Sequence, residues 1–425
     1  MSRRGSEWTI LAGAVLIAIA GYLVLWFGIK PSVFHRSRTD FGTFYRAGRM
    51  VLAGDGPCVY DLVAEGRYDN TLGTTAVDAE GRSVSLPFVF APFTLALYAL
   101  LALLPYRQAE ATWYAVNVVM LLALPLVLRK RRAIGMTSCT LGLILPLLFL
   151  PVVLALLQGQ PSILILLLLA LGDLNLADGK HAPAGCWLAL ASIKPQLILP
   201  LLLAILVWRK KETLAGFAAT SCGLCVVSFA IVGWRTTLRY PHALLQYASM
   251  GGRVGGEHPA GMPNLRGFLF VALHDYLRPA LLQKITLAIS LLVLAAMALL
   301  FWQYRRIAPV SFSLLVSVTL LTSYHSYLHD DSPLLLPLLL TGSVCLKIPD
   351  GWLRWMTGAA GLAIFIVPLL PTSLHTTALQ MFLAITALAG LLACQLIQEG
   401  PKAAASNLPE PSLPAELLSP EMMRI

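Results

Sequence analysis

Apolar runs long enough to cross a lipid bilayer recur along almost the whole chain. The first covers residues 8–29, and others follow from residue 86 to residue 397 with polar interruptions between them. About 20 consecutive apolar residues form a helix that crosses roughly 30 Å of hydrocarbon. Such spans are helical because lipid cannot satisfy free backbone groups. The sequence therefore predicts an all-α polytopic membrane protein with roughly 11 to 13 transmembrane helices.

Composition supports one membrane domain and no soluble one. Of the 425 residues, 57% are hydrophobic and 12% are charged, whereas a soluble protein carries about 25% charged residues. We predict a single transmembrane domain over residues 1–397. The segment 398–425, rich in Pro, Ala, Ser and Glu, is predicted to be a disordered cytoplasmic tail. The length favours a many-helix enzyme, transporter or channel over a simple anchor.

The net charge of +10 is explained by membrane topology. Basic clusters at residues 129–132, 209–211 and 305–306 follow the positive-inside pattern of cytoplasmic loops. With Arg3 and Arg4 also inside, the first span runs outward across the cell (inner) membrane. A nucleic-acid partner is not expected.

The seven cysteines give no sign of a metal or redox site. Six of them lie in or beside apolar runs. Cys222 and Cys225 have the spacing of a redox or metal pair, but no acidic residue or histidine neighbours them, so they are interpreted as small packing residues within a helix.

Two long polar segments are predicted on the outer side, at residues 30–85 and 233–263. The first contains Asp40 and apolar residues near helical spacing, which predicts an amphipathic helix on the membrane surface. Its aromatic residues Phe41, Phe44 and Tyr45 are expected to seat that helix on the bilayer.

Prolines interrupt two of the apolar runs. Residues 86–105 begin with Pro87 and Pro92, so we predict that this run does not cross fully. Residues 182–193 and 197–207 are each too short to span alone, and Pro195 favours a break between them. This arrangement places Lys194 in an outward-facing cavity.

Four polar groups then fall on the outer side of the membrane, and charges at such boundaries are usually functional. They are the Asp40 stretch, Gln158-Gly159-Gln160, Lys194 and the cluster from His325 to Asp331. The charged groups also have structural interpretations. Asp40 can cap a helix N-terminus, Lys194 can extend to the interface from a helix end, and Arg46 and Arg49 can be solvated or bound to lipid headgroups. The fourth group combines ligand types seen at metal sites, but such residues in outer loops are more often structural or substrate contacts, and no metal is predicted: His325, His329, Asp330 and Asp331.

Five segments, in order, resemble glycosyltransferase family 87, the polyprenol-phosphate-mannose-dependent α-1,2-mannosyltransferases of the GT-C superfamily. They are Asp40-Phe41-x-x-Phe44-Tyr45-x-Ala47-Gly48 with Leu52-x-Gly54-x-x-Pro57 and Tyr60-Asp61, then Pro87-Phe88-x-Phe90-x-Pro92-Phe93, Gly159-Gln160, Ala184-Gly185 through Lys194-Pro195, and Tyr327-Leu328-His329-Asp330-Asp331. Two positions depart from the family pattern. Ser162 replaces an asparagine after Gly-Gln, and Cys58 interrupts the Pro-x-Tyr-Asp region.

The resemblance implies a GT-C-like bundle that moves a sugar, mannose in this family, from a polyprenyl phosphate to a glycan or glycolipid hydroxyl on the outer face. Asp40 would act as general base, and Lys194, helped by Arg46 or Arg49, would bind the donor phosphate. Inversion is expected, without metal or cofactor. The remaining candidates are substrate contacts: Tyr45, Gln160, His325, His329, Asp330 and Asp331.

Two other functions also fit the sequence. A transporter or flippase of a lipid-linked or sugar substrate would need polar groups near mid-bilayer that are reachable from both sides, whereas these groups gather on one side. Another GT-C enzyme, such as an arabinosyl or glucosyl transferase or a glycan ligase, would share the architecture.

Overall fold

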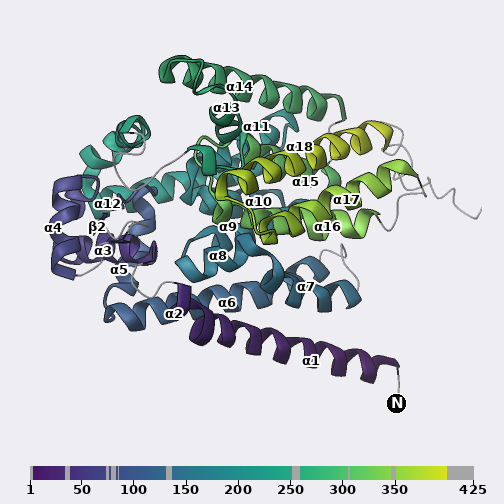
Figure 1. Cartoon of the computed structure of the whole chain (residues 1–425), viewed down its shortest axis with the longest axis horizontal. Helices are drawn as coiled ribbons and strands as arrows, with labels where there is room; N and C mark the ends of the chain where they lie inside the picture. The colour runs from purple at the N-terminus through teal and green to yellow at the C-terminus, as the bar shows by residue number, and fades with distance from the viewer. Residues whose placement is uncertain are drawn as a thin grey trace, which may run out of the picture.

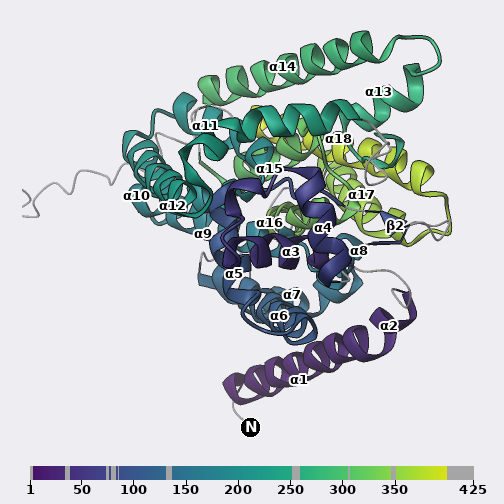
Figure 2. The same ribbon diagram turned by 90° about the vertical axis from the view of Figure 1, so that its left-hand side faces the viewer.

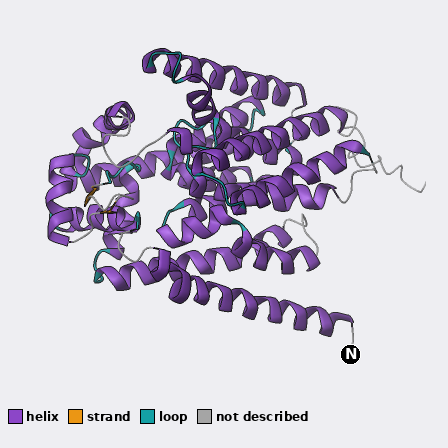
Figure 3. Ribbon diagram, viewed as in Figure 1, coloured by secondary structure: helices purple, strands orange, loops and turns teal. Residues whose placement is uncertain are grey.

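The computed structural model describes residues 3–33, 39–72, 76–77, 83–84, 86–130, 136–250, 259–304, 307–345 and 351–399. The described chain is almost entirely helical (Figure 3). A minimal antiparallel pair joins β1 (Ala76–Val77) to β2 (Ser83–Val84). The predicted all-α architecture is confirmed.

Among the described residues, six helical stretches are long and apolar enough to cross a membrane, which confirms a polytopic membrane protein. The first combines α1 (Arg3–Val24), the π-helical turn η1 (Leu25–Ile29) and α2 (Lys30–Val33). The others lie in α6 (Tyr106–Lys130), α12 (Lys211–Met250), α14 (Pro279–Tyr304), α17 (Trp352–Ile366) with η7 (Val367–Leu369), and α18 (Leu374–Glu399).

Shorter helices lie between these spans along the chain. Between the spans lie α7 (Met136–Leu148), α8 (Leu150–Gln158), α9 (Ser162–Ala177), α10 (His181–Leu190), η4 (Ala191–Ile193), α11 (Pro195–Val207), α13 (Leu265–Leu273), α15 (Pro309–Thr322) and α16 (Leu335–Cys345). The remaining short elements are α3 (Phe41–Leu52), η2 (Gly56–Cys58), α4 (Leu62–Leu72), η3 (Pro92–Thr94), α5 (Leu95–Leu101), η5 (Pro259–Gly261) and η6 (Leu328–Leu334).

The helices separate into a buried centre and a lipid-facing shell. All residues of α15 from 310 to 321 are buried, and α9 is mostly buried as well. By contrast, only 17% of the apolar window is buried in the spans of α12 and α14. Because lipid tails are as apolar as these side chains, such faces can lie against the hydrocarbon of the bilayer.

One end of the bundle carries a cap of short elements. Figure 1 shows α3, α4 and α5 gathered at the end opposite the start of α1, and Figure 2 shows the same three helices facing the viewer. Helices α3 and α4 of this cap belong to the first predicted outer segment.

The structure of the cap corrects the prediction that the aromatic residues after Asp40 seat a helix on the bilayer surface. Phe41, Phe44 and Tyr45 are 0%, 2% and 7% exposed, so they pack inside the protein and do not lie on the bilayer. Phe44 stacks on Tyr98 with ring centroids 4.8 Å apart. A helix with this pattern can bury its apolar face against protein as well as against lipid, and here α5 supplies the partner surface.

Each of the two proline-interrupted runs is broken in the structure. The run over residues 86–105 contains only a short apolar helix, Pro92–Leu101, which is outside the set of candidate spans. The helical run over 182–207 breaks at Lys194, whose φ and ψ are −114° and 91°. In contrast, residues 233–250 do not form a loop: α12 bends at Gly233, with φ of 81°, and stays helical to Met250. Residues 251–258 and the predicted tail from 400 onward lie outside the described residues.

Candidate active site

Asp40 lies at the N-terminal end of α3, but its carboxylate does not cap the helix. Oδ2 instead accepts a hydrogen bond of 2.6 Å from Nε2 of Gln160. The interpretation of Asp40 as an N-cap therefore does not account for where its side chain points.

Gln160 reaches Asp40 from a tight turn between α8 and α9. Gly159 ends α8 with a φ of 73°, a conformation that costs glycine little because it has no Cβ. A Cβ there would lie 2.7 Å from Cβ of Phe41. Gln160 is buried, and its Oε1 has no hydrogen-bond partner in the described part of the chain. That oxygen can accept a hydrogen bond from a ligand hydroxyl.

Helix α6 is hydrogen-bonded to both the segment that carries Asp40 and the turn that carries Gln160. The Thr39 hydroxyl donates a 2.9 Å bond to Glu110, and Trp113 Nε1 donates a 2.8 Å bond to the carbonyl of Gly159. Residues three apart share one helix face, so Glu110 and Trp113 anchor Asp40 and Gln160 side by side.

Lys194 lies where the chain turns from η4 into α11. The residue is 6% exposed, and its ammonium forms an ion pair with Asp330. Nζ also lies 5.2 Å from the centroid of the Phe90 ring, within range of a cation–π interaction. Lys194 is therefore held inside the protein and does not extend from a helix end to the interface.

Asp330, in η6, organises the cationic side of the site. It accepts hydrogen bonds from the Tyr327 amide at 3.0 Å and the Ser162 hydroxyl at 3.3 Å, and Nε2 of His329 lies 3.4 Å from Oδ1. Burial opposes ionisation, yet the neighbouring His329 and Lys194 hold the pKa of Asp330 well below its usual range. Ser162, the residue that departs from the family pattern, thus binds a carboxylate of the site.

Asp331 is buried next to Asp330, but its pKa is shifted in the opposite direction. Burial and the charge of Asp330 raise the pKa of Asp331 well above its usual range. Its one described hydrogen bond is a long contact of 3.5 Å with the Ser326 hydroxyl. Ionisation of Asp331 is therefore disfavoured, and Asp331 does not line the cavity described next.

A cavity of about 210 Å³, the Asp40 cavity, unites most of the predicted site. The aromatic residues Phe44, Phe90 and Tyr327 also line it. It brings together residues from segments far apart in the sequence: Asp40, Gln160, Lys194, His325, His329 and Asp330.

Besides Asp331, three predicted site residues do not line this cavity. Arg46 is 1% exposed and forms ion pairs with Glu65 and, at 2.6 Å, with Asp69. Arg49 is exposed and makes a 3.4 Å contact with the Ala102 carbonyl. The Tyr45 hydroxyl donates to the carbonyl of Leu104 at 3.0 Å. The buried guanidinium of Arg46 is thus committed to carboxylates of the cap.

An extended segment, residues 86–90, forms one wall of the Asp40 cavity, and sequence reasoning did not identify what holds it. Side chains form hydrogen bonds with its backbone. Arg46 donates a bond of 2.7 Å to the Leu86 carbonyl, Glu65 accepts a bond of 3.1 Å from the Phe88 amide, and Tyr60 donates a bond of 2.7 Å to the Phe90 carbonyl. A usable signal in the sequence was the i, i+4 spacing of Glu65 and Asp69, which places both carboxylates on one face of a short helix.

Within the described residues, no group of three or more His, Cys, Asp or Glu side chains is arranged to hold a metal ion. The fold and the site define a multi-pass membrane protein with a polar cavity at one end of its helix bundle.

The comparisons identify the class of enzyme. The model of glycosyltransferase family 87 matches residues 88–323, more than half of the chain, so the chain belongs to this family and is a membrane glycosyltransferase. The match includes Gln160 and Lys194, whereas Asp40 precedes it and Asp330 follows it. No curated protein and no solved structure matches the chain.

Proposed function

We propose that the enzyme transfers a hexose, mannose in the first instance, from a polyprenyl phosphate to an acceptor hydroxyl on the extracytoplasmic face. The observation that carries the proposal is the shared cavity, which presents one carboxylate, Asp40, and one ammonium, Lys194, to the same space. Family membership supplies glycosyl transfer, and this favours an enzyme over a transporter.

The proposed step is a single displacement. The acceptor O–H gives its proton to Asp40 as its oxygen attacks the anomeric carbon. The bond from that carbon to the phosphate oxygen breaks, and its electron pair leaves with the polyprenyl phosphate. Gln160 orients the Asp40 carboxylate through the 2.6 Å bond. Attack opposite to the departing phosphate inverts the anomeric configuration.

Lys194 stabilises the departing phosphate. An ammonium has three N–H donors, and the ion pair with Asp330 leaves others for the ligand. Preorganised charge of this kind lowers the barrier because the group is already oriented when negative charge develops. Asp330 thus acts as a positioning residue that fixes the ammonium beneath the donor.

The orientation rests on charge and architecture together. Helix α1 starts at the end of the bundle opposite α3, α4 and α5 (Figure 1). Arg3 and Arg4 precede the first span, and basic residues favour the cytoplasm. This supports an extracytoplasmic position for the cap and for the Asp40 cavity.

The test is Asp40→Asn in purified enzyme supplied with polyprenyl phosphate mannose. Loss of a general base is expected to lower kcat by about 10²- to 10⁴-fold, while the thermal midpoint stays near that of the wild type. Asp55→Asn, an exposed acid of the same cap, is the matched control and should retain activity. Wild-type transfer by Asp40→Asn would exclude this mechanism.

A further inference from the structure

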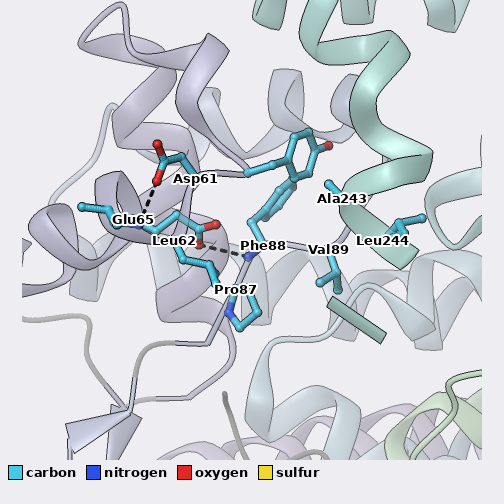
Figure 4. A pocket seen from close by; sticks show the side chains of 10 residues that line it. Asp61, Leu62, Glu65, Pro87, Phe88, Val89, Ala243 and Leu244 are labelled. Atoms are coloured by element: carbon cyan, nitrogen blue, oxygen red, sulfur yellow. Dashed lines mark hydrogen bonds between the residues drawn. The ribbon is translucent and has the colours of Figure 1, made fainter. Parts of the chain in front are cut away.

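A second cavity of about 360 Å³ also borders the 86–90 wall. We call it the Tyr60 cavity. Pro87 and Val89 line both cavities, so the two cavities adjoin at this wall. Figure 4 shows Glu65 and Asp61 on one side of the Tyr60 cavity, with Ala243 and Leu244 of α12 on the other.

The lining combines aromatic rings with hydrogen-bonding oxygens. Tyr60 and Phe88 contribute rings with centroids 6.0 Å apart. Asp61 is exposed and uses Oδ1 to accept from the Val63 and Ala64 amides. Oε1 of the buried Glu65 has no hydrogen-bond partner in the described part of the chain. Binding sites for small polar ligands have this mixture of apolar surface and a few placed polar groups.

The charge of this cavity excludes a phosphate and fits hydroxyl groups. The described residues that line it include no lysine, arginine or histidine, whereas the Asp40 cavity presents Lys194. Carboxylate oxygens accept hydrogen bonds, and sugar hydroxyls supply them. Glu65 suits such a ligand in either form, since a protonated Oε1 donates and an ionised one accepts.

We propose that the Tyr60 cavity binds the non-reacting sugars of a carbohydrate acceptor whose reactive hydroxyl reaches Asp40. The inference rests on the proposed function, because an acceptor bound there continues around the wall into the Asp40 cavity. The wall then serves two substrates, with the donor on the Lys194 side and the distal acceptor sugars on the Tyr60 side.

A binding experiment without donor tests the cavity apart from catalysis. Ala243→Trp fills the Tyr60 cavity, and Leu238→Trp adds the same ring at a position on α12 that is 65% exposed and outside the cavity. Saturation-transfer NMR with α-1,2-mannobiose on the purified full chain should show contact in wild type and Leu238→Trp, and loss in Ala243→Trp. Equal signals in the two variants would overturn the inference.

A kinetic experiment tests the same cavity through chain length. Octyl α-mannoside and octyl α-mannobioside serve as acceptors for wild type and Asp61→Asn, because asparagine keeps the cap on α4. Removing one charged hydrogen-bond partner should raise the KM for the disaccharide by about fivefold or more. The KM for the monosaccharide, the KM for donor and kcat should not change.

The two proposals fail in different ways. Normal sugar transfer with no preference for the longer acceptor, or with no effect of Ala243→Trp on it, overturns the acceptor cavity alone. Mannobiose binding that Ala243→Trp removes, in an enzyme that transfers no mannose, overturns the proposed reaction and leaves the cavity's ligand class standing.

Discussion

At the scale of single residues, Asp330 and Asp331 show how partners decide the protonation of adjacent carboxyl groups. Both are 1% exposed, so burial works equally against ionisation of each. Asp330 has Lys194 as an ion-pair partner, whereas Asp331 faces the charge of Asp330. The surroundings therefore favour ionisation of Asp330 and oppose ionisation of Asp331.

This contrast predicts different outcomes for one substitution at two neighbouring positions. Asp331→Asn replaces a carboxyl group whose ionisation is disfavoured with a neutral amide, and should change the free energy of unfolding by less than about 1 kcal/mol. Asp330→Asn leaves the buried ammonium of Lys194 without its counter-charge and should cost about 3–5 kcal/mol. Thermal unfolding of both variants in the same detergent measures the difference, and equal losses would contradict the assigned charges.

At the scale of elements, the cap is held by a buried ion cluster on α3 and α4. One guanidinium, Arg46, serves two carboxylates, Glu65 and Asp69. Burial raises the pKa of Glu65 to about 8, although Arg46 and the Phe88 amide oppose the rise. Because Arg46 and Glu65 also bind the 86–90 wall, the cluster connects the cap to the Asp40 cavity.

The raised pKa predicts that the cap loses stability at alkaline pH. Its folded value of about 8 exceeds the ordinary glutamate value of about 4.3, so the folded state binds more protons between these values. The stabilisation is complete below the ordinary pKa, falls as pH rises, and is lost above about 8. Unfolding midpoints from pH 5 to 9 should decline in wild type, and the decline should be smaller in Glu65→Gln. An identical decline in both would refute the assignment.

The approach of α3 to α5 depends on Gly48. A Cβ at Gly48 would lie 2.3 Å from the Tyr98 carbonyl oxygen, so the helices cannot pack this closely with any larger residue. Since α3 carries Asp40, a shift of this helix moves the carboxylate relative to Gln160 and Lys194.

Gly48→Ala is therefore expected to lower both stability, by about 1–3 kcal/mol, and transfer activity. Gly66→Ala on α4 is the matched control, because a Cβ there meets no atom within 4 Å and alanine favours a helix by about 1 kcal/mol. Thermal midpoints and initial rates measure both effects. A Gly48→Ala enzyme as stable and active as Gly66→Ala would show that the contact is not needed.

At the scale of the whole molecule, the proposed orientation puts the cap outside the cell membrane. Cys58 ends η2, within the cap, and is exposed. The C-terminal segment from residue 398 was predicted to be cytoplasmic, so the two regions should differ in their access to a reagent that cannot cross the membrane.

We expect a membrane-impermeant maleimide to label intact cells through Cys58 when the other cysteines are replaced by serine. A matched variant that carries only Ser406→Cys should be labelled after the cells are permeabilised and not before. The readout is the mass shift of the purified protein. The reverse pattern would place the Asp40 cavity in the cytoplasm and contradict the proposed donor geometry.

The sequence by itself determined the class of fold and several elements of the site, because these depend on local chemistry. Apolar runs specify helices in lipid wherever they occur. Pro195 specifies the break that holds Lys194, and a tight turn at Gly159 needs glycine for its positive φ. These signals placed Asp40, Gln160, Lys194 and the His329–Asp330 pair in the same candidate site before any distance was available.

Only the tertiary structure decided the partners of each charged group. Arg46 and Lys194 are both cations in sequence, yet packing buries Arg46 against Glu65 and Asp69 and presents Lys194 to the cavity. Likewise, the aromatic face of α3 can pack against either lipid or protein. It packs against protein because α5 lies beside it. Long-range partners depend on how helices pack, because a buried charge takes whichever counter-charge the packing brings within reach.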